Sequence, residues 1–141
     1  MLVSVEWSRL TDELDPRWDS ERVLYAYSGP GIRRPLYIGK ADFCTVRERW
    51  LGKPKLWNYI WSEFGLTRDE VLVFVGDVSL AARLSQELLE DIEGLLIRRI
   101  KPHGNVNTPG QIRDGLLVHC VGTWPISTTV FRYPVQSYLV R

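Results

Sequence analysis

Residues 71–78 restrict the fold more than any other stretch, because they form an almost unbroken apolar run that is rich in β-branched side chains. Such a run favours a β-strand, and its lack of polar alternation indicates that both faces of the strand are buried. The chain is therefore expected to pack helices against a β-sheet. No apolar stretch in the sequence approaches the roughly 20 residues that a membrane-spanning helix needs, so no membrane association is expected.

Weaker patterns on either side of this run complete the predicted fold. Two β-type runs, 23–28 and 35–39, are joined by a turn rich in Gly and Pro, which predicts a hairpin. The first twenty-odd residues are expected to be irregular or partly helical. Helices are expected at 42–51, 55–64 and 80–100, and one or two further strands within 116–121 and 128–140. The predicted fold class is α+β, a small, mostly antiparallel sheet of about three core strands flanked by helices.

The composition is that of an ordinary globular protein. The 141 residues are 45% hydrophobic and 25% charged, which predicts a single domain spanning residues 1–141. The two cysteines, Cys44 and Cys120, have no spacing typical of a zinc site or a disulfide framework. The acidic start lacks the layout of a signal peptide, so a cytoplasmic location is expected.

The net charge of +1 combines two opposite local excesses. Residues 33–55 carry seven cations and two anions, whereas residues 6–22 carry six anions and three cations. This separation is compatible with a small anion-binding face on the protein. A solvated charged surface is the simpler explanation of the charge clusters taken alone.

One carboxylate in the predicted helix 80–100 falls on the wrong face. At 3.6 residues per turn, Glu93 shares a stripe with Leu89, Leu96 and Ile97, whereas the other acids of this helix share a polar stripe. A carboxylate at the margin of a buried face needs a cation, a metal ion or donor hydrogen bonds. An internal ion pair with an arginine and a functional role explain the position of Glu93 equally well.

Four groups of residues occur in an order and at spacings that belong together: Val23-Leu24-Tyr25, Tyr37-Ile38-Gly39-Lys40, Arg47, and Glu93 with Pro102 and Asn105. Eleven residues separate Tyr25 from Tyr37, and Arg47 follows Tyr37 by ten positions. Together the groups resemble the GIY-YIG nuclease superfamily over residues 23–105, with the two ends of the chain as extensions. The first group departs from the family because it lacks the glycine of the first tripeptide.

The resemblance implies a metal-dependent endonuclease that hydrolyses DNA phosphodiester bonds by water attack. It implies that Tyr25 is the general base, that Tyr37 orients water or phosphate, and that Arg47 pairs with the scissile phosphate. Lys40, with Arg47, is expected to lower the pKa of Tyr25. Glu93 is expected to hold one Mg²⁺ (or Mn²⁺) ion, which needs few protein ligands because it keeps most of its water. The substrate-binding residues implied are Gly39, Arg49, Tyr59 and Asn105.

A catalytically inactive nucleic-acid-binding or protein-interaction domain on the same fold is the alternative, since a fold does not guarantee activity. Without the matching intervals, the tyrosines would be interpreted as strand aromatics. The near-neutral net charge also predicts weak independent affinity for DNA. A protein partner, a homodimer or the two extensions of the chain are therefore expected to select the substrate.

Overall fold

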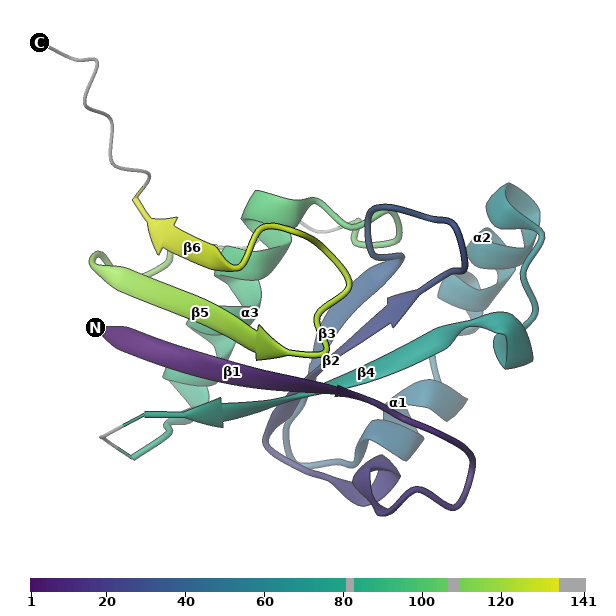
Figure 1. The fold of residues 1–141 in the computed structure, drawn as a ribbon, viewed down its shortest axis with the longest axis horizontal. Coiled ribbons are helices and arrows are strands. Elements are labelled where there is room, and N and C mark those ends of the chain that lie inside the picture. The colour runs from purple at the N-terminus through teal and green to yellow at the C-terminus, as the bar shows by residue number, and fades with distance from the viewer. Residues whose placement is uncertain (81–82, 107–109, 135–141) are drawn as a thin grey trace, which may run out of the picture.

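The computed structural model describes residues 1–80, 83–106 and 110–134, which form a six-stranded mixed sheet with three α-helices and two short 3-10 helices (Figure 1). The strands are β1 (Leu2–Arg9), β2 (Val23–Ser28), β3 (Tyr37–Ala41), β4 (Leu72–Ser79), β5 (Leu116–Gly122) and β6 (Val130–Tyr133). The helices are η1 (Pro16–Asp19), α1 (Val46–Leu51), α2 (Pro54–Phe64), η2 (Arg68–Glu70) and α3 (Gln86–Ile100). The strand order in the sheet is β3-β2-β4-β1-β5-β6.

The expectation of about three core strands is wrong, because both ends of the chain contribute strands to the same sheet. β1 pairs antiparallel with β4 and parallel with β5, and β6 pairs antiparallel with β5. The expected irregular or partly helical start is wrong for residues 2–9, which form β1, and is confirmed for residues 10–22, which are irregular apart from η1. Val3, Val5 and Trp7 in β1 are buried and alternate with more exposed residues, the period of two that is typical of a strand with one covered face. The architecture as a whole is α+β.

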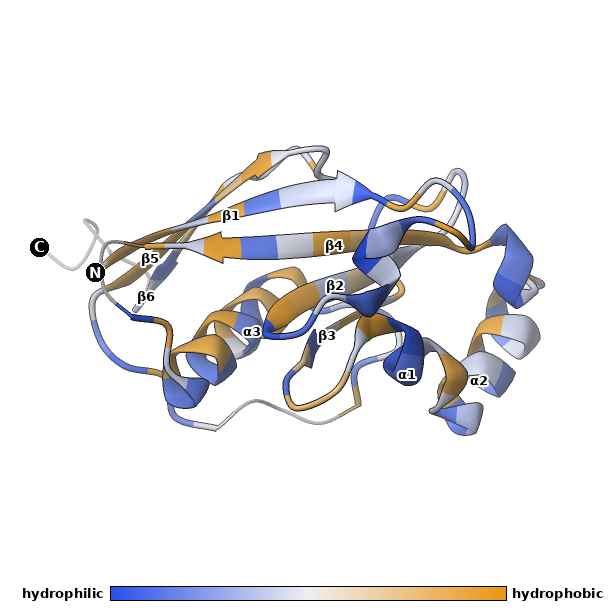
Figure 2. Cartoon of the chain, turned by 90° about the horizontal axis from the view of Figure 1, so that it is seen from below, coloured by the Kyte–Doolittle hydropathy of each residue, from blue (hydrophilic) through white to orange (hydrophobic). Residues whose placement is uncertain are grey.

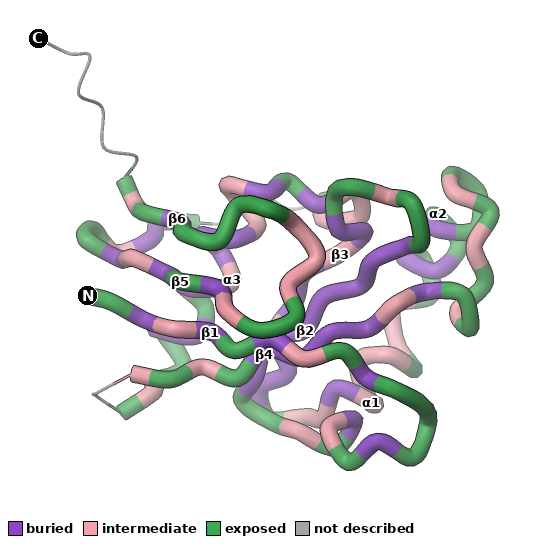
Figure 3. Tube along the Cα trace, in the orientation of Figure 1, coloured by how far each residue is buried: buried purple, intermediate pink, exposed green. Residues whose placement is uncertain are grey.

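Two apolar clusters lie on opposite faces of β2 and β4. In β2, Leu24 and Ala26 join the cluster packed under α3, whereas Tyr25 and Tyr27 join the cluster packed under α1 and α2. Figure 2 shows α3 on one side of β2 and β3, and α1 and α2 on the other. Every residue of β2 is consequently buried (Figure 3). The predicted burial of the 71–78 run on both faces is confirmed as far as Gly76, since Asp77 is exposed.

The hairpin of β2 and β3 forms where it was expected, but two helices start later than the sequence predicts. α1 begins at Val46 because Thr45 and Glu48 form a capping box, in which the Thr45 hydroxyl accepts from the Glu48 amide at 3.1 Å. α3 begins at Gln86, where the Ser85 hydroxyl accepts from the Leu88 amide at 3.0 Å. Among the described residues, no helix has the length and apolarity needed to cross a membrane.

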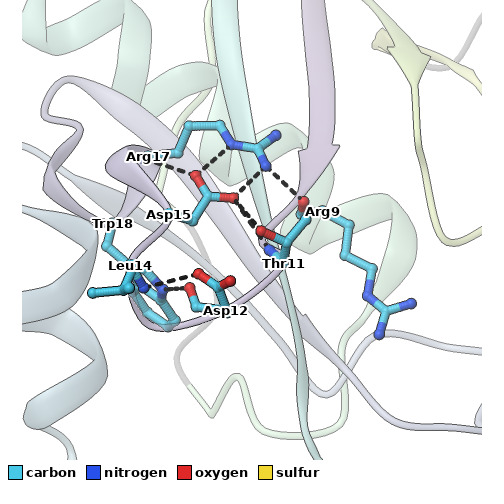
Figure 4. Close-up of polar contacts among 7 residues, drawn as sticks. All are labelled: Arg9, Thr11, Asp12, Leu14, Asp15, Arg17 and Trp18. Atoms are coloured by element: carbon cyan, nitrogen blue, oxygen red, sulfur yellow. Dashed lines mark hydrogen bonds and ion pairs between the residues drawn. The ribbon is translucent and has the colours of Figure 1, made fainter.

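A compact polar network fixes the connection between β1 and η1 (Figure 4). The Asp15 carboxylate accepts from the backbone amides of Thr11 and Arg17, at 3.1 and 3.0 Å, and forms an ion pair with the Arg17 guanidinium. That guanidinium also donates to the Arg9 carbonyl at 2.9 Å. Hydrogen bonds from Arg17, only partly opposed by burial, hold the pKa of Asp15 well below its usual range.

Candidate active site

A groove of about 870 Å³ lies beside β3, between the start of α2 and the middle of α3. Its walls also include the segments that follow α3. The lining residues from the strand and helices and the residue before α2 are Tyr37, Lys40, Lys53, Pro54, Lys55, Leu56, Tyr59, Glu90, Asp91, Glu93, Gly94 and Ile97. The segments after α3 add His103, Gly104, Asn105, Val106, Gly110, Gln111 and Ile112. The groove therefore brings together five residues that the sequence analysis assigned to the site: Tyr37, Lys40, Tyr59, Glu93 and Asn105.

Glu93 is the chemically exceptional carboxylate of this groove. Its side chain is half-buried, and burial is the largest influence on its pKa, which is raised. The nearby Lys40 and Arg49 charges and the Lys40 backbone amide oppose this shift, whereas Glu90 adds to it. Glu90 pairs with Lys40 at 3.3 Å and Asp91 pairs with Arg113 at 2.6 Å. Within the described parts of the chain, Glu93 forms no ion pair at all, so the alternative of an internal ion pair with an arginine is not realised.

The two motif tyrosines lie behind and beside the groove. Tyr25 on β2 is directly paired with Gly39 on β3, and the Tyr25 and Tyr37 ring centroids are 6.0 Å apart. The Tyr25 hydroxyl packs over Gly39 so closely that a Cβ at that position would lie 2.5 Å from it. Tyr37 is half-buried and lines the groove, and the Lys53 ammonium lies 5.1 Å from its ring centroid.

The electrostatics of Tyr25 oppose the role of general base. The residue is 1% exposed, and its burial raises the pKa of the phenol far above the usual value. Arg49 lowers this pKa, but Tyr27, Tyr37 and Glu93 act in the same direction as burial. The expected depression of the pKa by Lys40 and Arg47 is therefore not found. Tyr25 stays protonated near neutral pH and is a hydrogen-bond donor, because a phenol that holds its proton this tightly is a poor base.

The structure separates the two arginines of α1. Arg47 points to the other side of the molecule, where its Nε lies 3.4 Å from Asp19 and its guanidinium donates to the Glu13 carbonyl at 3.2 Å. It lines a different cavity, of about 600 Å³. Arg49, in contrast, lies near enough to Glu93 and Tyr25 to lower the pKa of both. Of the two, Arg49 is the one whose charge acts on Glu93, and sequence analysis placed it among the substrate-binding residues; the role of Arg47 stays a prediction.

Arg49 is held beside the site without a partner of its own. Its Nε is buried and has no hydrogen bond, and within the described segments its side chain forms no ion pair. A buried guanidinium nitrogen without an acceptor is costly, because the lost hydration is not replaced. This nitrogen is enclosed by the chain, and Arg49 is not among the residues that line the groove.

Asn105 and Tyr59 line the groove and also contact other parts of the fold. Asn105 bridges the outer edge of β3, since its amide donates to the Ile38 carbonyl at 2.9 Å and its carbonyl accepts from the Ile38 amide at 3.0 Å. These two hydrogen bonds fix the chain after α3 to β3. Tyr59 is exposed on α2, with its ring 6.2 Å from that of Phe64.

Among the groove residues not assigned to the site from the sequence, three have basic side chains: Lys53, Lys55 and His103. The lysines flank the proline that opens α2, and they belong to the basic 33–55 segment already noted. His103 lies inside the Pro-x-x-Asn sequence, between Pro102 and Asn105. The basic segment was the available signal for the lysines, whereas nothing in the sequence distinguished His103 from a loop residue.

The residues present fit one weakly coordinated divalent ion better than a fully protein-bound one. No group of three or more His, Cys, Asp or Glu side chains in the described residues is arranged to hold a metal ion. Glu93 supplies one anionic ligand, whose burial the Lys40 and Arg49 charges oppose only in part, since its pKa remains raised. A single carboxylate suits Mg²⁺, because this ion prefers oxygen ligands and retains several waters.

Comparison of the chain with protein-family models, curated proteins and solved structures found no match.

Proposed function

We propose that this protein is a metal-dependent endonuclease that hydrolyses DNA phosphodiester bonds in the groove beside β3. The observation that carries the proposal is Glu93, a half-buried carboxylate that lines the groove, forms no ion pair in the described residues and lies within range of the Arg49 charge. A groove carboxylate with a nearby guanidinium that is not paired to it is the arrangement expected for binding a metal ion and a phosphate together. The order and intervals of the GIY-YIG motifs support the same chemistry.

Each side chain has a role that follows from its charge and burial. Glu93 holds the divalent ion, which, when bound, would neutralise phosphate charge and activate a water molecule. Arg49 receives the phosphate oxygens, since its planar guanidinium provides two parallel donors. Tyr37 orients the phosphate or water from the groove wall. The buried Tyr25 phenol contributes a hydrogen bond and supports Gly39 rather than taking a proton.

The burial of Tyr25 favours the alternative function as well. A nuclease needs a proton acceptor for the attacking water, and the raised pKa of Tyr25 removes the candidate that the motifs offered. A domain that only binds nucleic acid or another protein has no such need. The alternative therefore stands as a second candidate, and it differs from the first in predicting DNA binding or protein binding without strand cleavage.

The test is a nicking assay on supercoiled plasmid DNA with purified protein and Mg²⁺ or Mn²⁺. We expect the wild type to nick the plasmid, and Glu93→Gln and Arg49→Ala to lose about 10²–10³-fold in rate. Arg47→Ala is the matched control on the same helix, and it should retain a rate within a few-fold of the wild type because Arg47 lines another cavity. Equal nicking by the wild type and the Glu93 and Arg49 variants would refute the assigned site.

The proposal includes the cellular setting expected from the sequence. The nuclease would act in the cytoplasm, and a protein partner or a second copy of the chain would direct it to its substrate. The groove supports this dependence, since only a few cations line it and each phosphate contact adds a limited, salt-sensitive increment of affinity.

A further inference from the structure

The charges of the groove are divided between its two walls. All three of its acids, Glu90, Asp91 and Glu93, lie on α3. Lys53 and Lys55 lie across the groove at the start of α2, and His103 lies on the segment after α3. An acidic wall attracts metal ions and a basic wall attracts phosphates, so the two walls favour different parts of one substrate.

The cations of the basic wall are not used by the fold. In the described parts of the chain neither Lys53 nor Lys55 forms an ion pair or a side-chain hydrogen bond. The Lys53 ammonium lies 5.1 Å from the centroid of the Tyr37 ring, and Lys55 is exposed. Lys40, in contrast, is already paired with Glu90. Lys53 and Lys55 therefore keep their full charge available to a ligand.

His103 adds a fixed neutral donor to the same groove. Its Nδ1 lies 3.0 Å from the Arg34 guanidinium, and because arginine only donates, Nδ1 accepts and Nε2 carries the proton. Burial, with a smaller contribution from Arg34, lowers the pKa of His103, so the ring is neutral at pH 7. The backbone amide of His103 donates to the Pro35 carbonyl at 3.2 Å, which anchors this segment to the chain before β3.

We propose that Lys53, Lys55 and His103 bind the DNA phosphates that flank the scissile one, and that the substrate of this groove is therefore a polynucleotide rather than a small phosphodiester. The inference rests on the proposed function, and it adds the site that recognises the strand. Glu93 and Arg49 act on one phosphate, whereas the basic wall holds its neighbours. The wall does not read base sequence, because lysine contacts to phosphate carry no sequence information.

The test measures DNA binding by fluorescence anisotropy, with the full chain in EDTA so that no cleavage occurs. A plot of log affinity against log salt has a negative slope, and removing one lysine that contacts a phosphate should make this slope less steep by about 0.9. We expect this change for Lys55→Ala and for Lys53→Asn, in which asparagine tolerates the left-handed backbone found at Lys53. Lys55→Arg should restore the wild-type slope. His103→Ala should weaken binding without changing the slope, because a neutral donor releases no counterion.

Arg33→Ala is the matched control, since Arg33 is an exposed cation outside the groove. Its slope should equal that of the wild type. Identical slopes for Lys55→Ala, Arg33→Ala and the wild type would overturn the inference, as would a wild type that does not bind DNA. The salt dependence is measured without hydrolysis. If only the variants of the groove lysines show a less steep slope, the inference is supported even when the wild type fails to nick plasmid DNA.

A second measurement separates strand binding from chemistry. The rate on bis(p-nitrophenyl) phosphate, a small diester without flanking phosphates, should be the same for Lys55→Ala and the wild type. Between about 50 and 200 mM salt, KM for DNA should rise about three-fold to four-fold more for the wild type than for Lys55→Ala, which has lost one phosphate contact. An equal loss on both substrates would overturn the inference, because the lysine would then act on the reacting phosphate.

Discussion

Replacing Gly39 by alanine tests the packing on which the whole site depends. An added Cβ would lie 2.5 Å from the Tyr25 hydroxyl oxygen and 2.6 Å from the adjoining ring carbon. Carbon atoms in proteins normally approach to about 3.5–4.0 Å, so the ring must move by about 1 Å. It has little room to do so, because Tyr25 is 1% exposed and its ring centroid lies 5.2 Å from that of Tyr27 and 6.0 Å from that of Tyr37.

The expected cost follows from two opposing contributions. Inserting a methyl group into a packed core costs about 1–3 kcal/mol. Replacement of glycine by alanine also restricts the unfolded chain, which returns about 0.4–1 kcal/mol. We therefore expect Gly39→Ala to lower the free energy of unfolding by about 1–2 kcal/mol, which corresponds to a Tm lower by about 3–8 °C for a domain of this size.

Urea unfolding of the wild type, Gly39→Ala and Gly52→Ala measures this cost. Gly52→Ala is the matched control, since a Cβ there would meet only ordinary contacts at 3.6 and 3.7 Å and φ is −92°. It should be neutral or stabilising. In a Tyr25→Leu background the cost of Gly39→Ala should fall by at least about 0.5 kcal/mol, the usual coupling of contacting residues. An undiminished cost in that background, or none in the wild type, would refute the reasoning.

Three further outcomes are expected. Asp15→Asn should destabilise the protein by about 1–3 kcal/mol at pH 7 through loss of the Arg17 pair. The pKa of Asp15 is lowered in the folded state, so the difference in stability between the variant and the wild type, measured by thermal unfolding, should shrink as the pH falls below the ordinary aspartate range. Glu93→Gln should raise the Tm in metal-free buffer at pH 7–8, since the raised pKa of Glu93 makes its ionised form unfavourable in the fold. An increase in Tm that is equally large at pH 4 would contradict this cause. Asn105→Ala should accelerate hydrogen exchange at the Ile38 amide, measured by NMR against Asn58→Ala, an exposed control on α2.

The central elements could be predicted from local patterns because their signals are strong. The residues of β4 are apolar on both faces, and β2 and β3 are joined by a Gly/Pro turn that permits only a short connection. The first strand was missed because its polar positions, Ser4, Glu6 and Ser8, resemble a surface segment when the alternating Val3, Val5 and Trp7 are not counted. Its partners are set by tertiary pairing with β4 and β5, which no local pattern contains.

The site was predictable as a set of residue types but not in its geometry. Motif spacing selected Arg47, yet residues two positions apart on a helix are rotated by about 200° from each other, so Arg47 and Arg49 point in different directions. The capping box at Thr45 and the packing of α1 on η1 set these directions. The burial of Tyr25 was equally inaccessible, because it arises from the rings of Tyr27 and Tyr37 closing around the residue.

The central position of β1 in the sheet has a consequence for how the chain folds during its synthesis. β1 is made before its two neighbours, β4 and β5, although it lies between them in the sheet (Figure 1). Until β4 and β5 have been made, both edges of a strand carrying Val3, Val5 and Trp7 lack their native hydrogen-bond partners. Such distant pairing slows folding and leaves edges open to foreign chains, so the nascent protein should depend on chaperones more than its small size suggests.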